Sequence, residues 1–153
     1  MKVRIKKLCE NAVMPRKAHA DDAGFDLVAT SKKIDDSGAL VFGTGLAFEI
    51  PIGFVGLLFP RSSNAKKDLL LSNSVGVIDS GYRGEVTMKF KPAMRFQDGD
   101  GGGEPEKVEC KFYDVGDRIG QLIIMPYPEI EFDEVDELSE SERGTGGYGS
   151  SGR

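Results

Sequence analysis

The stretch Leu40–Phe59, "LVFGTGLAFEIPIGFVGLLF", contains two runs rich in apolar and β-branched residues, separated by a Pro-Ile-Gly break at 51–53. Short runs of this composition, bounded by glycine and proline, are typical of β-strands. The sequence therefore predicts one strand over Leu40–Ile50 and a second over Phe54–Phe59.

The same pattern recurs on both sides of this stretch, and helical periodicity is nearly absent. The segment Ser63–Leu70 is the exception, because it could form a turn or two of helix. Many short strands at this spacing predict an all-β fold: a sandwich, a barrel or a jelly roll. The further predicted strands are Val3–Leu8, Phe25–Ala29, Leu69–Ile78, Glu85–Ala93, Lys107–Tyr113 and Ile119–Phe132.

Length and charge exclude several classes of protein. A chain of 153 residues forms one domain and can bury a core without the support of disulfides or bound metals. The formal net charge of −5 argues against general nucleic-acid binding, which requires a basic face. The start, "MKVRIKKLCE", lacks the apolar core of a signal peptide, and no run approaches the length of a membrane span. We expect a soluble cytoplasmic protein with no nucleic-acid or membrane partner.

Histidine and cysteine are too rare for the common metal and nucleophile sites. His19 is the only histidine, which excludes a His-based metal cluster and a Ser-His-Asp triad. Cys9 and Cys110 are the only cysteines and form no CxxC pattern, so neither a disulfide framework nor a zinc site is indicated.

The C-terminal part of the chain is polar. An acidic stretch at 133–142 leads to "RGTGGYGSSGR" at 143–153. The GxGxxG within it is not a dinucleotide-binding fingerprint, because no strand precedes it and no helix can follow. Composition alone favours a flexible tail. The predicted division is a β-barrel domain over 1–132, an acidic linker over 133–142 and a Gly-rich tail over 143–153. "QDGDGGGEPE" at 97–106 is predicted to be a loop between strands.

The segment "NSVGVIDSGYRGEV" (73–86) is predicted to be a β-hairpin with Asp79 in its turn. Two interpretations of Asp79 remain open from the residues alone. Its carboxylate could cap backbone N–H groups of the turn. Alternatively, held at a strand end near Tyr82, it could act as a general base.

The segment "LLFPRSSNAKK" (57–67) ends a strand and then offers Arg61, two serine hydroxyls and free backbone N–H groups. These donors suit a phosphate, although a plain polar loop after a strand has the same composition. In "GDRIGQLII" (116–124), Gly116 and Asp117 indicate a turn before a buried strand, and Arg118 is interpreted as a surface or core-edge charge.

Five stretches together closely resemble the motifs of the trimeric dUTPase family. They are "HADDAGFDLVA" (19–29), "PRSS" (60–63), "NSVGVIDSGYRGEV" (73–86), "GDRIGQLI" (116–123) and "RGTGGYGSSG" (143–152). The resemblance implies a jelly-roll-like β-barrel that assembles as a homotrimer. It also implies hydrolysis of dUTP to dUMP and pyrophosphate with Mg²⁺, which limits uracil incorporation into DNA and supplies dUMP for dTMP synthesis.

On the nucleoside side, the resemblance assigns Asp79 as the general base for the water that attacks the α-phosphorus. Tyr82 matches the tyrosine that packs under deoxyribose and leaves no room for a 2′-hydroxyl. The residues matching those that read uracil are Asn73, Val77, Ile78, Asp79 and Thr87. Backbone groups discriminate against cytosine because its amino group would place a donor against a donor.

On the phosphate side, the resemblance implies phosphate contacts from Arg61, Ser62, Ser63 and Gln121. Asp26 matches an aspartate that orders the phosphate-side arginine and the waters of the metal. Mg²⁺ would be held by triphosphate oxygens and waters, with no direct protein ligand. Arg118 is expected to be a structural residue.

In the tail, Arg143 matches the arginine that clamps the γ-phosphate, and Tyr148 matches the aromatic that stacks on uracil. Gly149 belongs to the glycines that let backbone N–H groups wrap the phosphates, so the tail would close over the nucleotide as a lid. The chain departs from the family pattern in four places. Ser63 stands where glycine is usual, Gly120 where alanine is usual and Tyr148 where phenylalanine is commoner, and the 97–106 loop looks longer than most.

Two other functions compete with dUTP hydrolysis as an interpretation of this sequence. A dCTP deaminase has a related fold, but the tyrosine at Tyr82 and the Gly-rich tail argue against it. A non-enzymatic binding role could use the 97–106 loop or the acidic linker as a partner surface. The intact Asp79, Tyr82 and Arg143 argue against a loss of catalysis.

Overall fold

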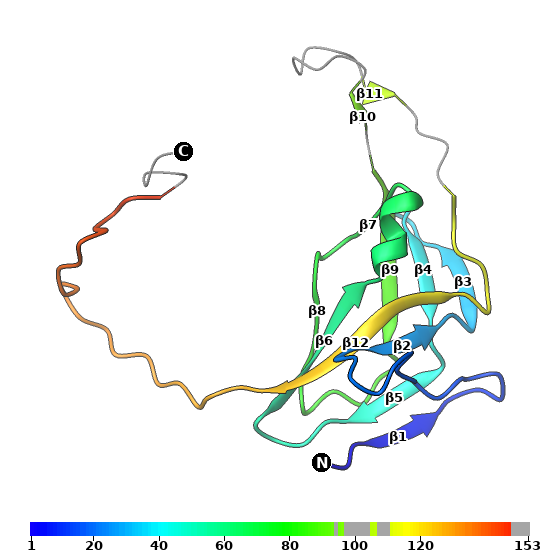
Figure 1. The fold of residues 1–153 in the computed structure, drawn as a ribbon, viewed down its shortest axis with the longest axis horizontal. Coiled ribbons are helices and arrows are strands. Elements are labelled where there is room, and N and C mark those ends of the chain that lie inside the picture. The colour runs from blue at the N-terminus through cyan, green and yellow to red at the C-terminus, as the bar shows by residue number, and fades with distance from the viewer. Residues whose placement is uncertain (94, 97–104, 107–110, 148–153) are drawn as a thin grey trace.

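The computed structural model describes residues 1–93, 95–96, 105–106 and 111–147, and within these ranges the fold is all-β, as the sequence predicts (Figure 1). Within the described ranges the helical content is one short 3₁₀ turn, η1, over Ser62–Lys66. This turn overlaps Ser63–Leu70, the segment in which a turn or two of helix is expected, and begins one residue before it.

Two four-stranded antiparallel sheets form the body of the molecule. The first has the order β2 (Phe25–Val28), β12 (Arg118–Pro126), β6 (Phe54–Pro60), β8 (Gly76–Ile78). The second has the order β3 (Ser31–Ile34), β4 (Leu40–Gly43), β9 (Thr87–Pro92), β7 (Leu69–Leu71). Two further pairs complete the described strands: β1 (Arg4–Lys7) with β5 (Leu46–Glu49), and β10 (Arg95–Phe96) with β11 (Pro105–Glu106). Most sheet neighbours are distant in sequence, as in a jelly roll.

The core contains a cluster of three aromatic rings, Phe42, Phe90 and Tyr113, each at most 1% exposed. Their centroids lie 5.6–6.1 Å apart, and Phe42 meets the other two rings edge to face. Such arrangements are the preferred ones for aromatic pairs. Because Phe42 lies on β4, Phe90 on β9 and Tyr113 in the loop before β12, the cluster ties that loop to the second sheet.

Two predicted strands are each interrupted in the structure. The predicted Leu40–Ile50 is divided into β4 and β5 because the chain bends at Thr44 and Gly45. Gly45 has φ +64°, a conformation that glycine adopts without steric cost, and the buried Thr44 Oγ1 donates to Val86 O at 2.7 Å. The predicted Leu69–Ile78 is likewise divided into β7 and β8, with Ser74 at φ +59° between them.

The predicted strand over Ile119–Phe132 is too long at its C-terminal end. β12 ends at Pro126, and Pro128 follows, so two residues without a backbone N–H stop the ladder. Of the predicted strand Lys107–Tyr113, residues 111–113 are described and form no strand, while 107–110 lie outside the described residues. β3 was not predicted, because its four residues are all exposed and show no apolar alternation.

The segment 73–86 does not form the predicted β-hairpin. β8 pairs with β6 in the first sheet, and β9 pairs with β4 and β7 in the second. The backbone of Val86 instead bonds to the bend between β4 and β5: Val86 N–H donates to Leu46 O at 2.9 Å and Thr44 N–H donates to Val86 O at 3.2 Å. The residues 79–86, called here the β8–β9 turn, therefore carry the chain from one sheet to the other.

After Pro126 the chain leaves the sheets, and residues 127–147 lead away from them (Figure 1). Nearly all of these residues are exposed. Across the part of the chain that the structure describes, no helix has the length and apolar character needed to cross a membrane. Of the predicted 97–106 loop, residues 97–104 lie outside the described ranges.

Candidate active site

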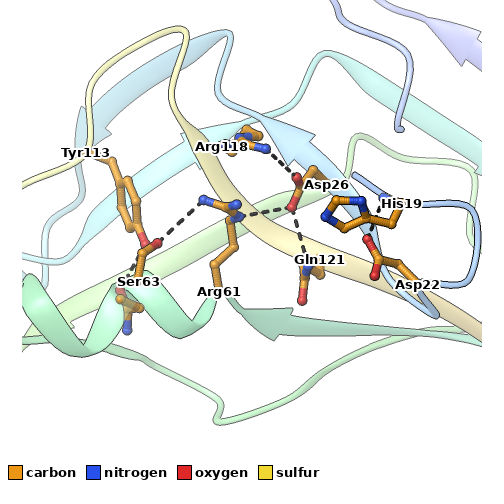
Figure 2. Close-up of polar contacts among 9 residues, drawn as sticks. His19, Asp22, Asp26, Arg61, Ser63, Tyr113, Arg118 and Gln121 are labelled. Atoms are coloured by element: carbon orange, nitrogen blue, oxygen red, sulfur yellow. Dashed lines mark hydrogen bonds and ion pairs between the residues drawn. The ribbon is translucent and has the colours of Figure 1, made fainter. Parts of the chain in front are cut away.

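Asp26 on β2 is the centre of a polar cluster at one end of the first sheet (Figure 2). Asp26 is 7% exposed, and both of its carboxylate oxygens accept hydrogen bonds. Arg61 Nε lies 2.9 Å from Oδ1, and Arg118 Nη1 lies 3.0 Å from Oδ2. Gln121 Nε2 adds a longer bond of 3.4 Å to Oδ1. A buried carboxylate needs such partners to remain charged.

Strand register explains why these residues meet. β12 lies between β2 and β6, with Gln121 opposite Asp26 on one side and opposite Phe59 on the other. Arg61 follows β6 directly, so it lies beside Gln121 at the same end of the sheet. A shift of register in the β12–β2 pairing between Arg118 and Gly120 marks a bulge, a feature that commonly redirects a side chain.

Arg61 also begins the turn that carries the predicted phosphate ligands. Its Nη1 donates to Ser63 Oγ at 3.5 Å, and its carbonyl accepts the Asn64 N–H at 2.8 Å. Ser62 is exposed, and Ser63 is half-buried. The structure therefore brings together five predicted residues: Asp26, Arg61, Ser62, Ser63 and Gln121. A guanidinium and hydroxyls on one edge suit charged phosphate oxygens.

A shallow pocket of about 140 Å³ lies at the β8–β9 turn, apart from the Asp26 cluster. Its lining includes five residues that the motif resemblance assigns to the nucleoside side: Val77, Ile78, Asp79, Tyr82 and Thr87. Asn73, assigned to the same side, is exposed on the chain before β8 and is not among the residues that line this pocket.

The β8–β9 turn is held by local hydrogen bonds. Tyr82 N–H donates to Asp79 O at 3.1 Å, and the Tyr82 hydroxyl donates to Glu85 O at 3.0 Å. Arg83 Nη1 donates to Ser80 O at 2.6 Å. The ring of Tyr82 lies so close to Gly84 that a Cβ there would fall 2.4 Å from its hydroxyl oxygen. A larger residue at 84 would therefore displace the Tyr82 ring from this position.

The Asp79 side chain does not perform the capping role that was the alternative to catalysis. The residue is exposed, and within the described part of the chain its carboxylate makes no hydrogen bond or ion pair. The contact with Tyr82 N–H uses the backbone carbonyl of Asp79 instead. The carboxylate is therefore free to accept a proton from a bound water.

The pocket and the Asp26 cluster lie at opposite ends of β6. Ile78 is opposite Gly56, and Asp79 lines a hollow together with Phe54 and Val55 at the start of β6. Arg61 follows the last residue of the same strand. Because a strand rises about 3.3 Å per residue, Asp79 and Arg61 are separated by roughly 20 Å. Within one chain, the carboxylate of Asp79 therefore cannot reach a phosphate that Arg61 holds.

Arg143 belongs to the segment 127–147, which leads away from the sheets (Figure 1). Its described hydrogen bond is local: Nε donates to Gly146 O at 2.9 Å. Tyr148 and Gly149, also assigned to the tail site, lie outside the described residues. Of the predicted lid, the structure therefore describes residues 143–147.

Sequence analysis missed two polar residues next to the Arg61 turn. Asn64 is 7% exposed and Tyr113 is 1% exposed, and the Tyr113 hydroxyl donates to Asn64 Oδ1 at 3.3 Å. Burial raises the pKa of Tyr113 above the ordinary value of 10.0. The signal available for Asn64 was its place, as a polar residue, in the segment 57–67 that carries the predicted phosphate ligands. Tyr113 gave no such signal, because the sequence predicts it only as the last residue of a strand.

Comparison with known families gives one match that spans most of the chain. The dUTPase family model matches residues 10–95 and 108–152. Two similar proteins are both named deoxyuridine 5'-triphosphate nucleotidohydrolase. The one from Nautilia profundicola is 39% identical, with all of both chains covered. The one from Clostridium acetobutylicum is 38% identical over 98% of this chain and 96% of its own.

Solved structures give the same result. The dUTPase of Staphylococcus bacteriophage 80alpha with dUPNHPP superposes with a TM-score of 0.78 at 32% identity, covering 99% of both chains. A mutant dUTPase from phage phi11 of S. aureus, whose structure concerns the coordination of a structural Mg(II) ion, has a TM-score of 0.69 at 30% identity. It covers 90% of this chain and 99% of its own.

Proposed function

The chain belongs to the dUTPase family and hydrolyses dUTP to dUMP and pyrophosphate, and from this premise we propose that Asp79 is the general base of the reaction. The carrying observation is an exposed carboxylate beside Tyr82 that makes no hydrogen bond within the described residues. Water is a poor nucleophile at neutral pH. A positioned carboxylate that removes its proton accelerates the attack by roughly 10²–10⁴-fold.

The pocket at the β8–β9 turn is the proposed uracil and deoxyribose site. β8 is the terminal strand of its sheet, so one edge of its backbone pairs with no other strand among the described residues. Unpaired N–H and C=O groups on such an edge can bond to a planar base in the way that a sheet edge bonds to an added strand. A pocket of about 140 Å³ is of a size for a pyrimidine ring and not for a whole nucleotide. Tyr82 borders it where the sugar would lie.

The turn at Arg61 is the proposed phosphate site, with Ser62, Ser63 and Gln121 as further ligands. The Asp26 carboxylate holds the Arg61 Nε. Arg61 Nη1 donates to Ser63 Oγ, so Nη2 is the terminal nitrogen that makes no hydrogen bond within the described residues and can donate to a phosphate oxygen. Arg118 forms an ion pair with the second oxygen of Asp26. This pair offsets part of the negative charge of the carboxylate, which weakens its competition with phosphate for Arg61.

A complete site requires more than one chain. The separation of roughly 20 Å between Asp79 and Arg61 rules out a site within one subunit. We therefore propose a homotrimer in which the β8–β9 turn of one subunit meets the Arg61 turn of another. The tail, with Arg143, Tyr148 and Gly149, would close over the nucleotide at that junction. A linker of about ten residues can span the tens of Å that this requires.

Mg²⁺ fits this site as a partner of the nucleotide. Both oxygens of Asp26 are taken by arginines, whose positive charge repels a bare cation. Among the described residues there is no group of three or more histidines, cysteines or carboxylates that could hold a metal ion. Triphosphate oxygens and waters would then hold the ion, which when bound offsets the charge of the phosphates.

A substrate panel tests this function. The purified chain is incubated with Mg²⁺ and with dUTP, UTP, dTTP or dCTP, and the products are separated and quantified. We expect dUMP and pyrophosphate in equal amounts from dUTP, and little turnover of the other three nucleotides. Ammonia released from dCTP would instead indicate the deaminase, and no turnover of any nucleotide would favour a binding role.

A further inference from the structure

The Arg61 turn rests on a small polar network that is buried against the core. The turn η1 packs beside the loop that precedes β12, and Tyr113 of that loop points its hydroxyl toward the turn (Figure 2). Tyr113 and Asn64 are 1% and 7% exposed. Every buried side-chain nitrogen and oxygen in the described residues has a partner. A tyrosine hydroxyl buried this deeply indicates a hydrogen-bonded network, because burying a polar group is costly unless its hydrogen bonds are satisfied.

The bonds run in one direction from Arg61 into the core. Arg61 Nη1 donates to Ser63 Oγ at 3.5 Å, and the Arg61 carbonyl accepts the Asn64 N–H at 2.8 Å. The Tyr113 hydroxyl donates to Asn64 Oδ1 at 3.3 Å, and Asn64 Nδ2 donates to Leu69 O at 2.5 Å. Asn64 therefore joins the backbone of the Arg61 turn to Tyr113 and to Leu69. Such chains polarise one another and resist rearrangement.

The core end of this network is rigid. The ring of Tyr113 packs against Phe42 at 6.1 Å and Phe90 at 5.6 Å between centroids. Its hydroxyl is therefore fixed by packing and not by the loop alone. Like any phenol, the Tyr113 hydroxyl is protonated at neutral pH and can donate to Asn64, and burial raises its pKa further. The opposite end of the network is Arg61, whose guanidinium is the proposed phosphate ligand.

We propose that Tyr113 is a positioning residue of the dUTPase reaction, which holds Asn64, and through Asn64 the turn that carries the Arg61 guanidinium, in the position that receives the phosphates. The inference rests on the proposed function of the Arg61 turn. Tyr113 and Asn64 are both buried, so they act on the phosphates through this turn and not by direct contact.

Tyr113→Phe tests the proposal, because it removes one oxygen and keeps the ring. Inorganic pyrophosphate and deoxyuridine are used as separate competitive inhibitors of dUTP hydrolysis. We expect the inhibition constant of pyrophosphate and the KM for dUTP to rise about tenfold, the size of one lost hydrogen bond in a charged network. We expect kcat to change little and the inhibition constant of deoxyuridine to stay the same.

Phe42→Leu is the matched control, because it disturbs the same aromatic cluster without touching a polar group. If Tyr113 is merely structural, the two variants will show the same kinetics at matched losses of thermal stability. A pyrophosphate effect in Tyr113→Phe alone supports positioning. Asn64→Ala should have at least this effect, and the double variant with Tyr113→Phe should lose little more than Asn64→Ala alone, because both substitutions break one chain of bonds.

Arg61→Gln separates the failure of this inference from the failure of the proposed function. If Arg61→Gln weakens pyrophosphate binding and Tyr113→Phe does not, Tyr113 is not a positioning residue. If Arg61→Gln also leaves pyrophosphate binding unchanged, the Arg61 turn is not the phosphate site, and the inference fails with it. Should Tyr113→Phe fold poorly, the kinetics of Tyr113→Phe and Phe42→Leu are compared at a temperature at which thermal melts show both variants to be folded.

Discussion

The two carboxylates of the site have opposite surroundings, and these surroundings explain their proposed roles. Asp26 is 7% exposed and accepts bonds from two arginines and a glutamine, so it is held as a fixed anion that orients Arg61. Asp79 is exposed and makes no such bond within the described residues. A general base must be free to take a proton, and a fixed partner of arginine is not.

Asp79→Asn should bind dUTP with a KM close to that of the native chain while kcat falls by roughly 10²–10⁴-fold, because the amide keeps the shape but cannot accept the proton. Steady-state kinetics with dUTP measure both constants. Asp36→Asn, the same substitution at an exposed carboxylate between β3 and β4, is the control and should leave both unchanged. A loss of less than tenfold in kcat would make Asp79 a turn residue.

Tyr113 should make stability depend on pH in the alkaline range. Burial raises its pKa above the ordinary value of 10.0, so the folded chain keeps the phenolic proton when the unfolded chain has lost it. The stabilisation is therefore complete below about pH 10 and declines as pH rises through the folded pKa. The difference in Tm between the native chain and Tyr113→Phe should narrow from about pH 8 to about pH 11. A constant difference would contradict the prediction.

At the scale of elements, the packing of β12 on β9 depends on a small residue at Gly120. A Cβ on Gly120 would lie 2.2 Å from the Met88 sulfur and 3.0 Å from Phe59 O. Met88 is 1% exposed, so its side chain has little room to move away. The glycine that stands here instead of the family's usual alanine is thus paired with a methionine on the facing strand.

Gly120→Ala should lower the free energy of unfolding by about 1–3 kcal/mol, the typical cost of overpacking a core. The double variant Gly120→Ala, Met88→Val should lose less than the two single variants added together, because the smaller valine leaves space for the new methyl group. Urea denaturation of the four chains measures the coupling. Additive losses, or a fully stable Gly120→Ala, would show that the two side chains do not compete for space.

The C-terminal tail is expected to act in catalysis and not in folding. Removing residues 143–153 should leave Tm nearly unchanged, since the hydrogen bond described for Arg143 is local and the surrounding residues are exposed. Turnover should fall by about 10²–10³-fold or more, because Arg143 would no longer stabilise charge on the phosphates. Tyr148→Ala should cause part of this loss. An early-melting truncation would make the tail structural, and a fully active one would leave it without a role.

At the scale of the whole molecule, the strand β6 separates the two halves of the site. Its seven residues lie between the pocket of Asp79 and the turn of Arg61. Each chain would then carry one half of two different sites. Assembly is a condition of activity in this arrangement, because neither half performs hydrolysis without the other.

Mixing two inactive variants tests this arrangement directly. Asp79→Asn and Arg61→Gln are each expected to be nearly inactive alone. Hybrid trimers formed by unfolding and refolding the two together should regain activity, because some sites would combine an intact Asp79 from one subunit with an intact Arg61 from another. Sedimentation monitors the assembly. A mixture that stays inactive as a trimer, or a monomer with full activity, would rule out the shared site.

What the sequence determined by itself is what depends on local pattern. The apolar runs separated by glycine and proline predicted β2, β6 and β9 to within a few residues, because alternation and turn chemistry act over neighbouring residues. The motifs in their order identified the family, which the comparisons confirm. The trimer, the metal and the tail contacts of Arg143, Tyr148 and Gly149 stay predictions.

Only the tertiary structure decided which of these residues meet. Arg61, Arg118 and Asp26 are far apart in sequence and come together through the register of β12 between β2 and β6. Asp79 was predicted for the same site, yet strand pairing places it at the other end of β6. Tyr113 gave no local signal, because its role depends on packing and on the position of Asn64. Sequence pattern reports the preference of a segment, whereas register, burial and contact depend on strands that lie far along the chain.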